Sequence, residues 1–391
     1  MADVRTGPRE PLARTITWEE LRDLAAFEAE KGCAVSLYLD LDPSLTPTPA
    51  DAATRLHSLL DEAGRGDGAN RRELTHDQRI GLRADFDRIR EYYEREFTRD
   101  GAHGLAIFCA GLDNIWRPLA LTEAVPDDAK VGRRLFLAPL VPLVGRGEGA
   151  LVVFVGRERG QFYRLHAGRL EEIADHTEDQ PGKHDQGGWS QPRYQRHIER
   201  LVQEHLREVA DELDRLIRQL HHPQVVVLST EETRAEFDDL LSKEAQAAIV
   251  GWTHAEAHAQ PPELLELATP VLERWRVEQE TAILERWREE IGRNGRAAAG
   301  WEQTLEAASD ERVEILLFQE GANRPAASCP RCGRVSAEGG KCPLDGTSME
   351  RSDDGLDLAV HQTLIHGGTV WAVQHHRDLD PVEGIGALLR Y

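Results

Sequence analysis

The sequence predicts an α/β protein, α+β in places, made of three domains with mixed-sheet α/β layers. Short apolar runs such as 34–39 and 225–229 alternate with longer stretches in which apolar residues recur every three or four positions, a pattern typical of strands alternating with helices. The chain has 391 residues, more than one domain normally holds. A short segment, 329–345, holds three of the five cysteines and predicts a small metal-bound insert in the last domain.

We expect an N-terminal α/β domain at 1–145, a central domain at 146–260 and a C-terminal α/β domain at 261–391 that carries the insert. Turn-forming residues and changes of periodicity place the elements within them. The expected helices are 18–31, 50–64, 74–97, 192–220, 231–243 and 262–292. The expected strands are 34–39, 104–110, 115–121, 150–156, 161–167, 170–174, 225–229, 247–251, 312–319 and 371–373.

Composition limits the classes of function. The N-terminus has no apolar run typical of a signal peptide, and Pro139 and Pro142 interrupt the longest apolar stretch, 135–144. We therefore expect a soluble, cytoplasmic protein without a membrane partner. The formal net charge of −22 argues against extended contact with nucleic acid, because such contact depends on Lys and Arg against phosphate. A small local basic patch is compatible with that charge.

The stretch from Pro181 to Leu220 combines a glycine loop with a long helix. Gly187 and Gly188 open backbone conformations that other residues avoid, and Pro192 suits a first helical turn. The helix has one apolar face, formed by Ile198, Leu201, Val202, Leu206, Val209, Leu213, Leu216, Ile217 and Leu220. Its first turns carry basic residues at helical spacing: Arg193, Arg196, His197 and Arg200. The pattern predicts a flexible tip on a rigid stalk whose base suits an anionic partner.

Two motifs resemble one known family. The run Gly187-Gly188-Trp189-Ser190-Gln191-Pro192-Arg193-Tyr194, preceded by Lys183-His184, is similar to the Gly-Gly-Gln loop and helix of the archaeo-eukaryotic class 1 release factor and Pelota superfamily. The C-terminal run from Gly384 to Tyr391 resembles the Gly-Ile-Gly-Gly-Ile-Leu-Arg-Tyr end of those release factors. Bacterial relatives include peptidyl-tRNA hydrolases of stalled ribosomes and the hibernation factor Balon. The stop-codon motifs of the family's N-terminal domain are absent from this sequence.

The resemblance implies a ribosome-binding translation factor whose loop enters the peptidyl transferase centre. Trp189 stands where the family has its catalytic glutamine, and an indole has only a donor N–H. In the hydrolytic interpretation Gln191 helps position water against the peptidyl-tRNA ester, Gly187 and Gly188 permit close approach, and Gln186 is a second candidate. In the alternative, a hibernation factor without chemistry, Trp189 stacks on an rRNA base.

In both interpretations the polar and basic residues of the loop and stalk meet rRNA or tRNA: Lys183, His184, Ser190, Arg193, Arg196 and Arg200. The resemblance also suggests elongation factor Tu as a companion. Two alternatives from other classes stay open, a surface glycine loop in an unrelated enzyme and a zinc-stabilised RNA-binding enzyme unrelated to ribosomes. We expect the ribosome-bound translation factor.

The cysteine-rich segment predicts a structural zinc ribbon. Cys329 and Cys332 form one Cys-x-x-Cys knuckle, and Cys342 with Asp345 repeats that spacing with a carboxylate in the last place. Zinc accepts thiolate and carboxylate ligands, and a closed site can hold together an insert that lacks its own core. A ribbon without metal and a ribbon completed by a distant histidine are the alternatives. Cys33 and Cys109 lie in strand patterns and are expected in the core.

Overall fold

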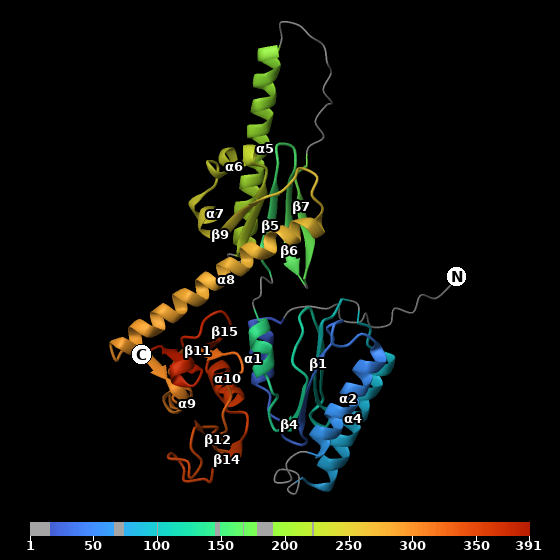
Figure 1. Ribbon diagram of the computed structural model, residues 1–391, viewed down its shortest axis with the longest axis vertical. Helices are drawn as coiled ribbons and strands as arrows, with labels where there is room; N and C mark the ends of the chain where they lie inside the picture. Colours follow the sequence, from blue (N-terminus) through green and yellow to red (C-terminus); the bar gives the residue numbers. More distant parts are fainter. Residues whose placement is uncertain are drawn as a thin grey trace, which may run out of the picture. The chain divides into compact units, whose positions relative to one another are not determined.

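The computed structural model describes residues 16–65, 74–99, 101–144, 149–166, 168–177, 191–220 and 223–391, and of residues 191–195 the backbone alone. The chain groups into two compact units, one made of Met1–Arg146 with Glu280–Tyr391 and the other of Gly147–Gln279. Each unit is an α/β structure built on its own sheets (Figure 1). The three-domain division expected above stays a prediction.

The N-terminal part of the first unit is an antiparallel sheet in the order β3-β2-β1-β4. Its strands are β1 (Ala34–Asp40), β2 (Gly104–Ala110), β3 (Ile115–Leu121) and β4 (Asp128–Gly132). Helices α2 (Pro49–Arg65) and α4 (His76–Arg95) bury their apolar faces against β1 and β2 (Figure 1). Thr75 and Gln78 form a capping box that begins α4. These helices and the first three strands confirm the sequence prediction.

Two elements differ from the prediction in this region. The expected helix 18–31 is α1 (Trp18–Ala25), because beyond it Ala29 donates its N–H to the Arg133 carbonyl at 2.8 Å and the chain becomes extended. Strand β4 was not predicted, since its sequence, DAKVG, lacks an apolar run. The Pro-containing stretch 135–144 forms a short 3-10 helix, η2 (Ala138–Leu143).

The C-terminal part of the first unit is a sheet in the order β10-β16-β11-β15. Its strands are β10 (Ala297–Ala299), β11 (Val313–Gln319), β15 (Thr369–Val373) and β16 (Ile385–Leu389). Strands β11 and β15 are parallel, which requires a crossover, and helix α10 (Gly355–Ile365) provides it. Together with α9 (Gly300–Ser309), α10 shares one hydrophobic cluster with α1, η2 and the far face of β1 and β2.

The cysteine-rich insert leaves this sheet after β11 as three short strands in the order β13-β12-β14. They are β12 (Ala326–Ser328), β13 (Val335–Ser336) and β14 (Glu350–Ser352). Ala326 and Val335 join the large cluster of the unit. The knuckles beyond them have a cluster of four residues, Ala327, Cys329, Cys342 and Met349.

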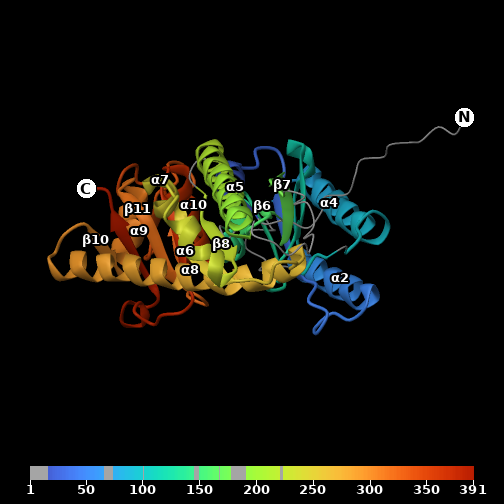
Figure 2. The ribbon, with the colours of Figure 1, turned by 90° about the horizontal axis from the view of Figure 1, so that it is seen from above.

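The second unit is a mixed sheet in the order β7-β6-β5-β8-β9, antiparallel from β5 to β7 and parallel from β5 to β9. Its strands are β5 (Leu151–Val155), β6 (Gly160–His166), β7 (Arg169–Asp175), β8 (Val225–Ser229) and β9 (Ile249–His254). One face packs on α5 (Gln191–Gln219), α6 (Glu231–Asp238) and α7 (Lys243–Ala248). The other face packs on the first turns of α8 (Pro261–Gly292), as Figure 2 shows.

The later half of α8 belongs to the first unit. Leu284 and Trp287 pack there with Leu317 and Leu388, and the Trp287 indole donates to the Ala298 carbonyl at 3.0 Å. Among the described helices, none combines the length and apolar character that a bilayer span requires.

Candidate functional site

Helix α5 begins at Gln191, directly after the glycine motif, and runs for 29 residues. At 1.5 Å per residue it is about 44 Å long. The apolar face expected from the sequence faces the sheet of the second unit, with Val202, Leu206, Val209, Leu213 and Ile217 buried. This one-sided burial fixes the rotation of the helix about its axis, and therefore which residues point to solvent.

The sheet approaches α5 closely at a glycine. A Cβ on Gly160 of β6 would lie 2.4 Å from a methyl carbon of Val209, so only glycine permits this packing distance. Asp214 of α5 accepts from the Ser242 hydroxyl at 2.6 Å, which joins the helix to the start of α7. Arg215 donates to Glu212 at 2.7 and 2.5 Å, and this hydrogen bond lowers the pKa of Glu212. The C-terminal half of α5 is thereby held firmly.

The N-terminal half of α5 carries the basic residues that the sequence singles out. Arg196 and Arg200 are exposed and, four residues apart, lie on one face of the helix. His197 is exposed beside them, while Arg200 is within 3.3 Å of Glu204 and is partly neutralised. The positive end of the helix dipole adds to this local charge. A cationic helix start is therefore present in a protein with a formal net charge of −22.

The loop residues themselves fall outside the described part of the chain. Those expected at the site and not described are Lys183, His184, Gln186, Gly187, Gly188, Trp189 and Ser190. Gln191 is the first residue of α5 and Arg193 lies in its first turn, but their side chains are not described either. The roles assigned to these residues stay predictions.

One buried polar group of α5 gave no signal in the sequence. His205 is 2 % exposed, and neither ring nitrogen has a hydrogen-bond partner among the described residues. Burying an imidazole without a hydrogen-bond partner costs folding free energy. In the sequence, His205 stands among the apolar positions of the helix and resembles an ordinary core residue.

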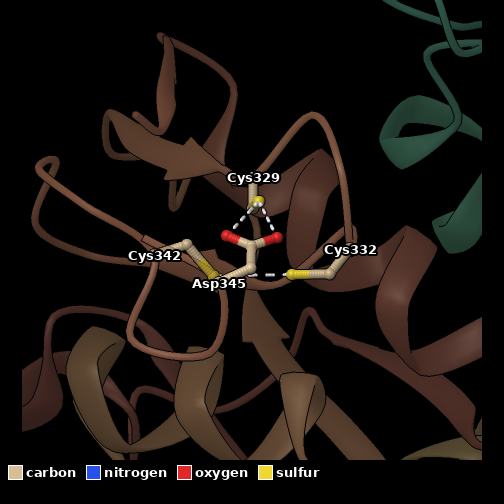
Figure 3. Close-up of side chains that lie close together, drawn as sticks. All are labelled: Cys329, Cys332, Cys342 and Asp345. Atoms are coloured by element: carbon tan, nitrogen blue, oxygen red, sulfur yellow. Dashed lines mark hydrogen bonds between the residues drawn. The ribbon is translucent and has the colours of Figure 1, made fainter. Parts of the chain in front are cut away.

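The metal ligands expected from the sequence come together in the insert (Figure 3). Two knuckles of the same geometry supply them. In the first, the Gly333 N–H donates to the Cys329 carbonyl at 2.9 Å; in the second, the Gly346 N–H donates to the Cys342 carbonyl at 2.9 Å. Both glycines have positive φ, +76° and +73°, which explains why each knuckle ends in glycine.

The donor atoms of Cys329, Cys332, Cys342 and Asp345 all lie within 4.8 Å of one another. The Cys332 and Cys342 sulfurs are 3.5 Å apart, and the Cys329 sulfur is 3.6 and 3.7 Å from the two Asp345 oxygens. Tetrahedral ligands around a zinc ion are separated by about 3.3–3.8 Å, so the donor set fits a divalent metal. The Thr347 N–H donates to Asp345 at 2.9 Å and lowers the pKa of that carboxyl, which favours the ionised form that a metal needs.

The insert is attached to the rest of its unit by polar contacts. Arg334 pairs with Asp310 at 2.7 Å, and the Gln362 amide of α10 donates to the Gly333 carbonyl at 2.9 Å. The Ser309 hydroxyl exchanges hydrogen bonds with the Val335 backbone at 2.9 and 3.0 Å. The first knuckle is therefore bound to α9 and α10.

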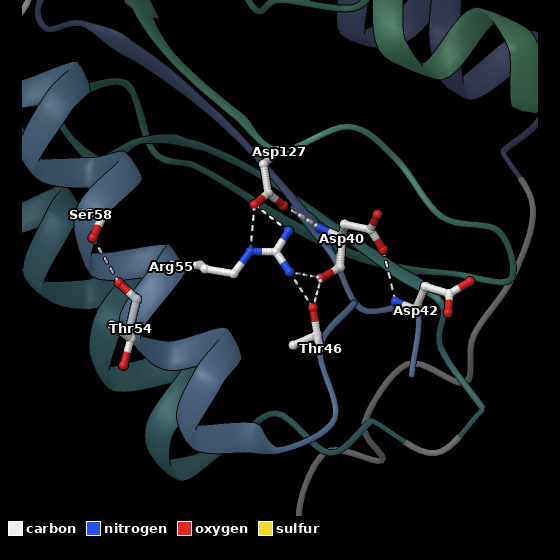
Figure 4. A network of polar contacts seen from close by, with 7 residues as sticks. All are labelled: Asp40, Asp42, Thr46, Thr54, Arg55, Ser58 and Asp127. Carbon is white, nitrogen blue, oxygen red and sulfur yellow. Dashed lines mark hydrogen bonds and ion pairs between the residues drawn. The ribbon is translucent and has the colours of Figure 1, made fainter. Parts of the chain in front are cut away.

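A polar network at the end of β1 was not predicted (Figure 4). The Arg55 guanidinium of α2 donates to Asp127 and to Thr46, and the Asp40 N–H donates to Asp127 at 2.6 Å. The contacts join residues up to 87 positions apart, which no local pattern can reveal. The network holds the loop after β1 against α2, which is a structural role.

Most of the C-terminal motif forms a buried strand. Residues 385–389 form β16, which pairs with both β10 and β11. A Cβ on Gly386 would lie 2.9 Å from the Trp287 indole nitrogen, and Gly384 has φ +79°. Packing therefore explains the glycines of this motif.

The chain is similar to known release factors and to Pelota. Peptide chain release factor subunit 1 of Archaeoglobus fulgidus is 23% identical over 344 residues, which cover 83% of this chain and 81% of that protein. The same subunit from Aeropyrum pernix is 25% identical over 202 residues, about half of each chain (50% and 51%). Among solved structures, Archaeoglobus fulgidus Pelota is similar with a TM-score of 0.36 and 14% identity, covering 100% of this chain and 99% of that one.

The family-model match and the archaeal relatives support a member of the archaeo-eukaryotic release factor and Pelota superfamily. Within it, residues 136–273 match the model of Bacterial archaeo-eukaryotic release factor family 10. The matched segment contains β5 to β9 and all of α5, and the resemblance seen in the two sequence motifs is confirmed.

Proposed function

We propose that this protein is a cytoplasmic, ribosome-binding translation factor that occupies the A site and hydrolyses the peptidyl-tRNA ester in ribosome rescue or release. One observation carries the proposal: in a member of this superfamily, a rigid helix with exposed Arg196 and Arg200 begins at the residue that follows the Gly-Gly-Trp-Ser motif. A helix of about 44 Å can carry a loop into a deep, anionic cavity that a compact domain cannot enter. The similarity to archaeal peptide chain release factors supports the same assignment.

In the hydrolytic mechanism the chain supplies positioning and not a nucleophile. Gln191, at the start of α5, would orient water against the ester carbon, with the glycines allowing close approach of the backbone. Arg193, Arg196 and Arg200 would meet rRNA or tRNA phosphate, with Lys183, His184 and Ser190 contacting the same RNA. Exclusion of bulk water from the closed site would strengthen each polar contact.

The test compares Gln191→Ala with wild type on purified ribosome nascent-chain complexes. We expect wild type to free the nascent peptide and Gln191→Ala to do so roughly a hundredfold more slowly, in the range seen when one positioning group is removed. Co-sedimentation of both proteins with ribosomes should be equal. Gln203→Ala, an exposed glutamine further along α5, is the matched control and should behave as wild type.

Equal release rates for wild type and Gln191→Ala would exclude Gln191 as the catalytic group. Wild type that frees no peptide but binds vacant ribosomes would favour the second candidate, a non-catalytic hibernation factor. The specific observation behind that candidate is Trp189, whose indole suits stacking on an rRNA base in place of the glutamine of the family.

The proposal includes partners and a cofactor. Peptidyl-tRNA is the substrate in the hydrolytic form, and elongation factor Tu is the proposed companion. Zinc is the proposed structural ion of the Cys329, Cys332, Cys342 and Asp345 cluster, since thiolate-rich tetrahedral sites select zinc. A bound zinc ion would cross-link the two knuckles, and elemental analysis of the purified protein measures it directly.

A further inference from the structure

Two sulfurs of the metal cluster lie close enough to react with each other. Cys332 and Cys342 belong to different knuckles, and their sulfurs are 3.5 Å apart (Figure 3). A disulfide is about 2.05 Å long, so bond formation needs an approach of roughly 1.5 Å. Cys332 is exposed to solvent, while Cys342 is buried beneath it. An oxidant in solution therefore reaches Cys332 first, with Cys342 next to it as the resolving thiol.

The remaining cysteines differ from this pair in their contacts. Cys329 is buried like Cys342 and belongs to the same cluster, but its sulfur lies 3.6 and 3.7 Å from the Asp345 carboxylate oxygens. Cys33 and Cys109 are buried in the N-terminal part, where the Cys109 thiol lies 3.2 Å from Asp85. Susceptibility to oxidants follows exposure and thiolate character, and ligation to a metal keeps a cysteine as thiolate. Cys332 is the one exposed cysteine of the described chain.

We propose that the ribbon is a peroxide-sensitive switch in which Cys332 and Cys342 form a disulfide and the metal ion is released. The Cys332 sulfur attacks one oxygen of hydrogen peroxide, the O–O bond breaks, and the departing hydroxide takes up a proton to become water. The Cys342 thiolate then attacks the Cys332 sulfur, the S–S bond forms, and the second hydroxide leaves as water. Two thiolates, one peroxide and two protons give one disulfide and two waters.

Loss of these two ligands removes half of the donor set. Cys329 and Asp345 alone cannot close a tetrahedral site, so the ion leaves. The ribbon depends on this cross-link because its own cluster has four residues, of which Cys329 and Cys342 are themselves ligands. The switch changes the shape of an insert that is fixed to α9 and α10 through Arg334 and Gln362.

The test treats the zinc-loaded full chain with one equivalent of hydrogen peroxide. Trypsin cleaves after Arg331, Arg334 and Lys341, which puts Cys329, Cys332 and Cys342 on three separate peptides. We expect a non-reduced map with a Cys332–Cys342 cross-link, release of one zinc per chain to a chromogenic chelator, and reversal by dithiothreitol with added zinc. Ribosomes are absent from the assay, so its outcome is independent of the proposed translation function.

Cys33→Ala is the matched control and should oxidise as wild type, whereas Cys332→Ser should form no cross-link to Cys342. Cys332→Ser also removes a metal ligand. The peptide map of the wild-type protein is therefore the measurement that tests the proposal. A cross-link through Cys329, a sulfinic acid on Cys332 without cross-link, zinc retained beside the disulfide, or a purified chain that takes up no zinc would each overturn the proposal.

Discussion

A single buried carboxylate, Asp357 of α10, fixes backbone that lies 220 residues away in the sequence. It accepts from the N–H of Leu137 at 2.6 Å and of Ala138 at 3.0 Å, at the start of η2. His361, one turn on, contacts the Leu135 carbonyl at 2.5 Å and lies 3.6 Å from Asp357. Burial raises the pKa of Asp357, and nearby His361 and the two N–H donors oppose that rise.

We expect Asp357→Ala to free the segment around η2, because two buried N–H groups lose their acceptor. The cost of such a loss is about 1–3 kcal/mol. Hydrogen exchange measured by mass spectrometry should show faster exchange of the Leu137 and Ala138 amides in the variant. Asp353→Ala removes an exposed carboxylate close to α10 and is the control, with unchanged exchange expected. Unchanged exchange in Asp357→Ala would show that the contact is dispensable.

At the scale of elements, α5 combines a firmly packed half with a cationic half. The sheet holds it through Val209 against Gly160, and Asp214 joins it to Ser242 at the start of α7, far from the residues expected to act. Glu212 pairs with Arg215 three residues further along α5, and it lies 4.0 Å from His176, which follows β7. The role proposed for the beginning of α5 therefore depends on packing further along the helix.

The lowered pKa of Glu212 gives a prediction with a definite sign. A carboxyl whose pKa is lower in the folded state adds stability above its unfolded pKa and loses it as the pH falls through the folded pKa. We expect Glu212→Gln to lower the melting temperature of the protein at pH 7, and the gap to wild type to close as the pH falls below about 4. The effect is under about 1 kcal/mol, because Arg215 is largely exposed.

Thermal melts from pH 7 to pH 3.5 measure the difference in melting temperature between Glu212→Gln and wild type, with Glu208→Gln as the control. Glu208 is exposed on α5 one turn before Glu212. A gap that widens towards low pH would contradict the assignment.

At the scale of the whole molecule, stability is unevenly distributed over the clusters. The large cluster of the first unit includes β1, α9, α10 and β16, whereas the knuckles have four residues of their own. Strands β12 and β13 reach the large cluster through Ala326 and Val335. A metal ion bound by the cluster should therefore stabilise the knuckles and little else.

We expect zinc removal by a chelator to expose residues 329–347 while β11 and β16 keep their protection from hydrogen exchange. The reason is that metal-binding free energy is folding free energy where no other core exists. Cys342→Ser should reproduce the effect, and Cys33→Ser should not. Loss of protection throughout the C-terminal sheet would show that the ribbon supports the whole unit.

Local patterns in the sequence determined much of this protein. The 3.6-residue period of 198–220 predicted α5 and its buried face, apolar runs predicted β1, β2, β5 and β8, and the spacing of the cysteines and Asp345 predicted the metal cluster. Each of these signals arises from interactions between residues a few positions apart, or from side-chain chemistry in a short segment. The glycine loop and the C-terminal motif likewise identified the superfamily.

The tertiary structure determined the features that depend on residues far apart in the sequence. Strand β4 exists because it pairs with β1, although its own sequence is not strand-like, and α1 ends at Ala25 because the following residues meet Arg133. The contacts of Asp357 and Arg55 join segments far apart in the chain. The 3.5 Å approach of Cys332 to Cys342, with one exposed and one buried, also follows from how the two knuckles fold together. Burial and long-range pairing set these features, and neither is encoded in any single stretch.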